Sequence, residues 1–327
     1  MIFNSAGRLR TGLVLLAVGA VFAAEVAAQA WPTRPVRIIV PFAPGGGVDT
    51  VSRLLAQKLT EQTGGAFVVE NRAGGGGLVG ADLVAKAAPD GYTLLTSAPE
   101  FSINPSVKKK MPFDALKDFV FVSQLTSGQF LLAAHPSVPV KSVRELIVLA
   151  KQRPDRLNYG SSGTGSINHL AGELLQSMTG IRWGHVPFKG SGPNLIGLMG
   201  GEIDFSFGST TSLVDQARAG RVRGIAVTGS QRYSELPNVP TIAESGVPGY
   251  NVTGWYGLYA PVATTPEIVR KLHSETVRGF SSPEMRERLI KAGNDPVVST
   301  PEAFDAFVRV EIAKWAKVVK DARLTLE

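Results

Sequence analysis

Two glycine-rich segments carry the clearest chemical signal in this sequence. The first contains Phe42, Ala43, Pro44, Gly45 and Gly46, followed by Gly47, Val48 and Asp49. It stands between an apolar run and a helical pattern, where a glycine-rich turn exposes backbone N–H groups at the positive end of a helix. Such a turn binds anions without a charged side chain, and Asp49 could cap the helix or orient the turn. The alternative is a structural turn whose glycines only satisfy its backbone angles.

A second segment repeats this arrangement between a strand and a helix. Its residues are Ser162, Gly163, Thr164, Gly165 and Ser166, with His169 one helical turn further on. We expect its hydroxyls and free N–H groups to face a bound carboxylate. His169 either contacts the ligand or packs behind the turn. If two lobes place both segments in one cleft, two helix N-termini point at the same anion.

Weaker candidates lie in two further segments. Lys189 follows Phe188 in a glycine-bounded loop and could pair with a ligand anion, although a single loop lysine usually faces solvent. Phe207 lies on a predicted strand, where its ring either reaches the cleft or packs in the core. Asp204 lies on the opposite face of that strand, because side chains alternate along a strand.

Enzymatic chemistry has little support in the sequence. A hydrolase elbow requires G-x-S-x-G, which residues 160–164 do not complete. The four histidines lack metal-ligand spacing and there is no cysteine, so we predict neither a metal nor a cofactor. Residues 75–80 match G-x-G-x-x-G, but the acidic residue of a dinucleotide site is missing. A secreted esterase that uses Ser166 and His169 stays open as the alternative.

The elements that must position these residues alternate between strand and helix. Strand patterns at 35–40, 67–70, 92–96 and 119–125 alternate with helical patterns at 48–59 and 78–88, and a second run extends from a strand at 130–134 to one at 222–228. This alternation predicts an α/β fold of two lobes, each a mainly parallel sheet flanked by helices. We assign residues 31–127 plus 254–327 to lobe 1 and residues 128–253 to lobe 2. The two crossings between the lobes would form a hinge.

The composition is typical of an exported globular protein. Residues 1–30 combine Arg8 and Arg10, a short apolar run and an A-x-A site, which predicts a signal peptide cleaved after Ala30 and a periplasmic location. The chain of 327 residues carries a net charge of +7. Its only dense basic run, Lys108–Lys110, is expected to be a solvated loop. Without a basic stripe, nucleic acid is excluded as a partner.

Taken together, the motifs resemble the Bug-type solute receptors of tripartite tricarboxylate transporters along essentially the whole mature chain. Any one motif is weak, but their order is specific. In order, the matching segments are 35–37, 40–46 with Asp49 and Arg53, 69–74, 89–94, 163–166 with His169, 185–190, 220–223, 239–241 and 244–246.

This resemblance implies a type II-like periplasmic-binding fold with a deep cleft. The receptor would be a non-enzymatic monomer that delivers a small organic carboxylate to a membrane permease. That ligand would be a di- or tricarboxylate, an aromatic acid or an acidic amino acid. The first glycine loop would hold one carboxylate, residues 163–166 would add contacts, and Ser97 and Ala98 would edge the cleft.

Two positions depart from the family pattern. Val48 stands where a hydroxyl or small residue is common, and Phe188 stands where tyrosine is usual. Both departures indicate a less polar ligand. A ligand sensor for a signalling system remains the other reading of the same receptor.

Overall fold

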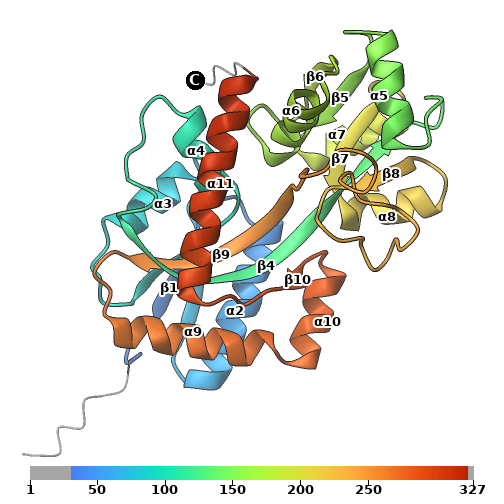
Figure 1. Ribbon diagram of the computed structural model, residues 1–327. Coiled ribbons are helices and arrows are strands. Elements are labelled where there is room, and N and C mark those ends of the chain that lie inside the picture. The colour runs from blue at the N-terminus through green and yellow to red at the C-terminus, as the bar shows by residue number, and fades with distance from the viewer. Residues whose placement is uncertain (1–30, 323–327) are drawn as a thin grey trace, which may run out of the picture.

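The computed structural model describes residues 31–322 and shows two α/β halves joined by long strands (Figure 1). The predicted signal peptide and its cleavage site lie outside the described residues. Among residues 31–322, every helix is too short or too polar to cross a membrane.

The first half contains a four-stranded arrangement in the order β2-β1-β3-β9. Strands β1, β2 and β3 are parallel, and β9 runs antiparallel to β3. Apolar residues of α2 at helical spacing, among them Val51, Leu55 and Leu59, are buried against this sheet. The strands are β1 (Val36–Val40), β2 (Phe67–Asn71), β3 (Thr93–Ser97) and β9 (Thr253–Pro261), and the helices are α2 (Gly47–Thr63), α3 (Leu78–Ala85), α9 (Pro266–Phe280) and α10 (Pro283–Lys291).

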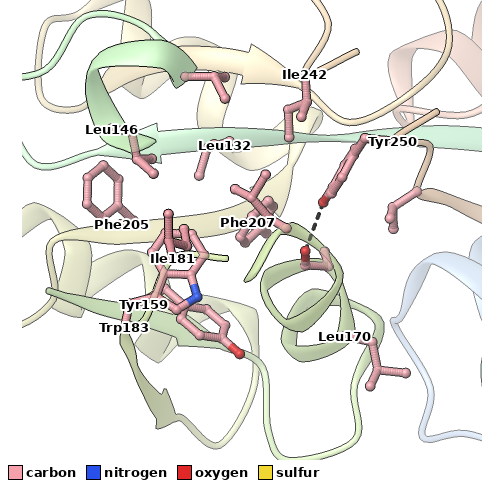
Figure 2. Packing of buried hydrophobic residues seen from close by; sticks show 14 of the residues in the cluster. Leu132, Leu146, Tyr159, Leu170, Ile181, Trp183, Phe205, Phe207, Ile242 and Tyr250 are labelled. Carbon is pink, nitrogen blue, oxygen red and sulfur yellow. Dashed lines mark hydrogen bonds between the residues drawn. The ribbon is translucent and has the colours of Figure 1, made fainter. Parts of the chain in front are cut away.

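The second half repeats the βα alternation around parallel strands β6, β5 and β7. Its core contains Tyr159, Trp183 and Phe207, all buried (Figure 2). The Tyr250 hydroxyl donates to the Ala171 carbonyl and ties the long loop after β8 to α6. The strands are β5 (Asn158–Ser161), β6 (Gly184–Pro187), β7 (Phe205–Ser209) and β8 (Arg223–Val227), and the helices are α5 (Val143–Gln152), α6 (Ile167–Thr179), α7 (Ser191–Met199) and α8 (Thr210–Arg218).

Strand β4 (Phe119–Ala134) crosses from one half to the other without a break. Residues 119–129 pair with β9, residues 130–134 pair with β7, and residues 131–134 also pair with β8 (Figure 1). The sequence predicted two strands here, 119–125 and 130–134, and that prediction is wrong. The intervening Thr126–Gln129 pairs with Thr253–Tyr256 of β9, so polar residues continue the ladder. The crossing strands are antiparallel to their neighbours, so each sheet is mixed.

Helix α11 (Pro301–Asp321) packs on both halves. Phe304 and Val308, near its start, join the core of the first half, while Trp315, Val318 and Val319, near its end, join the core of the second. The C-terminal helix therefore connects the halves in addition to β4 and β9.

Helix α4 (Glu100–Val107) was not predicted from the sequence. It contains Pro105 inside the helix, which removes one backbone donor and disguises the helical pattern. Phe101 packs on Phe119 and Tyr259 with ring centroids 5.2 and 4.5 Å apart. Tertiary packing thus holds a segment with a weak local signal as a helix, and this helix borders the cleft described below.

Candidate functional site

Hydrogen bonds to the Asp49 carboxylate anchor the first glycine segment, residues 42–49 (glycine turn 1). The buried Asp49 carboxylate accepts the Gly45 N–H at 2.9 Å, the Arg53 Nε–H at 3.0 Å and the Asn71 Nδ2–H at 3.0 Å. Asn71 also donates to the Phe42 carbonyl. Burial acts to raise the pKa of Asp49, but the hydrogen bonds from Arg53, Gly45 and Asn71 outweigh it and hold the pKa below its ordinary value. Asp49 thus orients the turn.

Helix α2 begins at this turn with unoccupied donors. Its N-cap, Gly46, provides no side-chain hydrogen bond, so the first N–H groups of the helix have no intrahelical or capping partner. Gly45 has a φ of 88°, in the left-handed region that favours glycine. A Cβ on Gly47 would overlap the Tyr256 hydroxyl, so only glycine lets β9 approach this closely.

The second glycine segment, residues 162–166 (glycine turn 2), is an internally bonded turn at the start of α6. The Ser161 hydroxyl accepts the Gly163 N–H, and the Ser166 hydroxyl donates to the Gly163 carbonyl at 2.7 Å while accepting the His169 N–H. Ser166 therefore caps α6. Gly165 donates its N–H to His169 Nδ1 at 3.0 Å, so that donor is already occupied.

Beneath glycine turn 2 lies a stack of two histidines. The rings of His169 and His185 are 3.8 Å apart between centroids and nearly parallel, at 13°. Burial lowers the pKa of His169 to about 3, with His185 adding to the effect, and burial lowers the pKa of His185 to about 4. Both rings are therefore neutral near pH 7. His185 Nε2 lies 2.7 Å from the Ser161 hydroxyl, which connects the stack to the turn.

This geometry does not form the Ser166–His169 dyad that the esterase alternative requires. The Ser166 hydroxyl contacts the backbone N–H of His169, whereas the ring accepts from Gly165 at Nδ1 and faces Glu173 at 3.7 Å through Nε2. A general base must hydrogen-bond the nucleophile through its ring. His169 packs behind the turn and positions it.

Two adjoining cavities lie between the halves. Cavity 1, about 630 Å³, is lined from the first half by Phe42, Gly76, Glu100, Asn104, Val107 and Lys108, and from the second half by Ser162, Gly163, Thr164, Gly165 and Ser166. Cavity 2, about 300 Å³, is lined by residues of both halves that include Gly47, Glu100, Gln129, Ile167 and Tyr256. The two glycine turns and the starts of α2 and α6 therefore share one crevice.

The remaining predicted site residues lie outside the linings of these two cavities. Glycine turn 1 exposes Ala43, Pro44, Gly45 and Gly46. Along the chain they lie between Phe42, which lines cavity 1, and Gly47, which lines cavity 2. Ser97 and Ala98 are buried at the end of β3, directly before α4. Lys189 is exposed.

Three predicted site residues pack inside the second half. Phe188 approaches Gly160 and Gly197, so its ring belongs to a hydrophobic cluster beside α7. Asp204 accepts the Asn158 N–H at 2.8 Å, and Phe207 is fully buried in the core. Val48 is also buried. The two family departures, at positions 48 and 188, thus fall outside the cavity linings.

Sequence reasoning missed several residues that line the crevice. Glu100, Asn104 and Lys108 come from the unpredicted helix α4 and its end, and Tyr256 comes from β9. Asn104 donates to the Gly76 carbonyl at 2.9 Å and fixes a third glycine-rich turn at the edge of cavity 1. In the sequence, the only feature that singled out this segment was the Lys108–Lys110 run. Lys109 and Lys110 are exposed as expected, but Lys108 is only partly exposed.

Glu100 stands out because it lines both cavities. Burial raises the pKa of its carboxyl, and its own backbone N–H offsets only part of this. Within residues 31–322 it takes part in no ion pair. Burial also raises the pKa of Tyr256 to about 12, and the charge of Glu100 adds to this shift.

No arginine lines either cavity, and the described residues contain no cluster of three or more His, Asp or Glu groups able to hold a metal.

Two α/β halves, joined by paired crossing strands and enclosing a crevice of glycine turns, define a two-lobed solute-binding protein. The chain belongs to the tripartite tricarboxylate transporter receptor family. The model of this family, described as "Tripartite tricarboxylate transporter family receptor", matches residues 51–324. Members of this family are periplasmic solute-binding receptors, so this protein is a receptor and the esterase alternative is wrong.

Relatives and solved structures agree with this assignment over nearly the whole chain. Protein BugT of Bordetella pertussis is 36% identical over 321 residues, which cover 96% of this chain and 98% of BugT. The structure of R. palustris Rpa4515 with adipate has a TM-score of 0.79 and 38% identity, covering 91% of this chain and 100% of that one. MatC (Rpa3494) from Rhodopseudomonas palustris with bound malate has a TM-score of 0.74 and 34% identity, covering 88% and 100%.

Proposed function

We propose that this receptor captures a small organic carboxylate between its lobes and delivers it to the membrane permease of a tripartite tricarboxylate transporter. The observation that carries the proposal is cavity 1, where glycine turn 2 lies opposite Phe42 of glycine turn 1. Most donors of glycine turn 2 are bonded within the turn, but Thr164, which lines cavity 1, makes no hydrogen bond within the described residues. Thr164 and the uncapped start of α2 would supply donors to an anion. The similar structures with adipate and with malate support a carboxylate ligand.

Capture would proceed by closure of the lobes about the crossing strands. Gln129 and Thr253 pair where β4 and β9 pass between the halves, so two adjacent strands bend together and define one axis. The ligand can favour the closed form only by its differential affinity for that form. Donors on both lobes provide this difference, because a carboxylate can contact both glycine turns only when they are close together.

Recognition would rest on backbone N–H groups, hydroxyls and one cation, not on an arginine clamp. The cation is Lys108 at the end of α4, which lines cavity 1. Helix N-termini contribute roughly half an elementary charge each. The site therefore attracts an anion while leaving its orientation to the shape of the two turns.

A thermal-shift screen of the mature chain, residues 31–327, tests this proposal. The panel contains dicarboxylates, tricarboxylates, aromatic acids, nicotinate-like acids and acidic amino acids. A ligand at a hundred times its Kd stabilises the folded state by about 2.7 kcal/mol, which gives a clear rise in Tm. The proposal fails if no acid in the panel raises Tm and calorimetry detects no binding.

The remaining parts of the proposal have separate tests. Mass spectrometry of the exported protein should give a chain that begins at Trp31 if cleavage follows Ala30. Light scattering should give the mass of a monomer with and without ligand. Deletion of the cognate permease should abolish uptake of the ligand while binding to the receptor persists.

A further inference from the structure

The crevice contains a carboxylate that an anion receptor does not need. Glu100 is the first residue of α4 and lines both cavities, so it lies where they adjoin. Its carboxyl is part-buried, and within the described residues no cation pairs with it. A charge that is removed from water is normally paired or neutralised. A partner for Glu100 is therefore expected from outside the chain.

Gln129 of β4 also lines cavity 2. The Gln129 Oε1 atom is buried and has no hydrogen-bond partner in the described part of the chain. Buried acceptors of this kind are rare and call for an explanation. This atom packs against Gly229 and is closed off from the cavity, so Glu100 is the charged acceptor that both cavities share.

Positive groups lie in both cavities, with Lys108 and the start of α6 in cavity 1 and the start of α2 in cavity 2, and the single carboxylate, Glu100, lies between them. Lys108 and the start of α6 make cavity 1 positive. In its ionised form Glu100 adds a negative charge at the junction, where it would repel the second carboxylate of a diacid. Lys108 is the only basic residue in the two linings, so no protein cation there neutralises a second carboxylate.

We propose that Glu100 selects a ligand that carries a protonated amine as well as its carboxylate, which makes this receptor specific for an amino acid over a simple di- or tricarboxylate. This inference rests on the proposed function, because the carboxylate of the ligand occupies cavity 1. The ammonium group faces Glu100 where the two cavities adjoin. Glu100 is a specificity residue that contacts the ligand.

The test compares diacids with amino acids of the same chain length. Calorimetry measures Kd for adipate, glutarate and succinate, for the ω-amino acids of equal length, and for aspartate and glutamate. The wild-type receptor should bind the amine-bearing member of at least one pair more tightly than its diacid. Glu100→Gln keeps the shape of the side chain and removes the charge, so it should shift the ratio of the two Kd values toward the diacid by about tenfold or more.

Glu302→Gln is the matched control. Glu302 also lies in the first turn of a helix, α11, but it is exposed and lines neither cavity. It therefore reproduces the loss of a favourable helix-dipole contact without changing the crevice. Its ratio of Kd values should equal that of the wild-type receptor.

The outcomes separate this inference from the proposed function. A wild-type receptor that binds acids, but whose Kd ratio Glu100→Gln leaves unchanged within about twofold, overturns the inference alone. A wild-type receptor that binds no acid of either kind overturns the proposed function and the inference with it.

A second measurement needs no variant. The pKa of Glu100 is raised by burial, so it takes up a proton before an exposed glutamate does. On acidification, preference for the amine should fall as Glu100 is neutralised, and it should begin to fall at a higher pH than an exposed glutamate would give. The other titratable groups in the two linings are Lys108, which is cationic, and Tyr256, which is neutral. A preference that does not change on acidification contradicts the inference.

Discussion

The Asp49 carboxylate accepts the backbone N–H of Gly45 at 2.9 Å, and this contact closes glycine turn 1 over the start of α2. The same carboxylate is paired with Arg53, one helical turn further along. The buried carboxylate of Asp49 is therefore engaged by groups of the protein. It fixes the direction of the N–H groups of glycine turn 1, which we propose contact the ligand, because it anchors the turn through Arg53 and Asn71.

Replacing Asp49 by asparagine should loosen glycine turn 1. The buried hydrogen bonds from Gly45, Arg53 and Asn71 lose their charged acceptor, and we expect the free energy of unfolding to fall by about 1–3 kcal/mol. Denaturant unfolding measures this change, and calorimetry should show weaker carboxylate binding. The matched control is Asp305→Asn, which breaks an exposed i,i+4 pair with Arg309 and should cost less than about 1 kcal/mol. Equal losses in both variants would contradict the anchoring role.

Two substitutions of Gly46 distinguish the effect of charge from the effect of crowding at the start of α2. A Cβ at this position meets nothing closer than 4.0 Å, and Gly46 does not have a positive φ, so Gly46→Ala should retain binding. Gly46→Asp should lose most of it, because aspartate at an N-cap occupies the helix donors and repels the ligand anion. Calorimetry on the two variants checks the contrast. Equal affinity in both would show that the α2 donors take no part in binding.

Lys108 should contribute to affinity through its charge. Lys108→Gln is expected to raise Kd for carboxylates by about threefold to tenfold, with a smaller effect at high salt. Lys109→Gln is the control, since Lys109 is exposed and does not line cavity 1. Titrations at two salt concentrations measure both variants. Identical behaviour of the two lysine variants would remove Lys108 from the site.

The histidine stack predicts acid sensitivity of the second lobe. The pKa of His169 falls from 6.5 to about 3 on folding. Between these two pH values the unfolded chain therefore binds a proton that the folded chain does not bind. This contribution to stability is fully present above about pH 6.5 and is lost as pH falls toward the folded value. At pH 5 the loss is about 2 kcal/mol for His169. Burial raises the pKa of neighbouring Glu173, which opposes the loss at lower pH.

Unfolding measured by denaturant between about pH 7 and about pH 5 checks this prediction. His169→Gln should reduce the dependence on pH by roughly half, because it removes one of two buried rings and His185, with its pKa lowered to about 4, still titrates. His273→Gln serves as a control for loss of a histidine elsewhere: His273 lies on α9 in the first half. If His169→Gln keeps the full dependence on pH, the stack is not its source.

Local sequence determined the βα alternation and both glycine turns. Their signals are short-range: apolar residues at helical or strand spacing, glycine at the turn between them, and N-cap residues before proline at Thr265, Ser282 and Thr300. The Ser142 and Ser166 caps are equally local, since each accepts the N–H of the third residue that follows. For such features the chain needs only its own neighbours.

The tertiary structure decided what the turns face and which other groups join them. Helix α4 has an interior proline and is held by contacts with distant strands, so Glu100 and Lys108 reach the crevice through packing that no local pattern reveals. The aromatic ring of Phe188 and the histidine at 169 pack inward for the same reason: burial against Gly160, Gly197 or His185 depends on residues far along the chain. Spacing along the sequence placed the donors, and long-range packing placed the carboxylate that we propose selects the ligand.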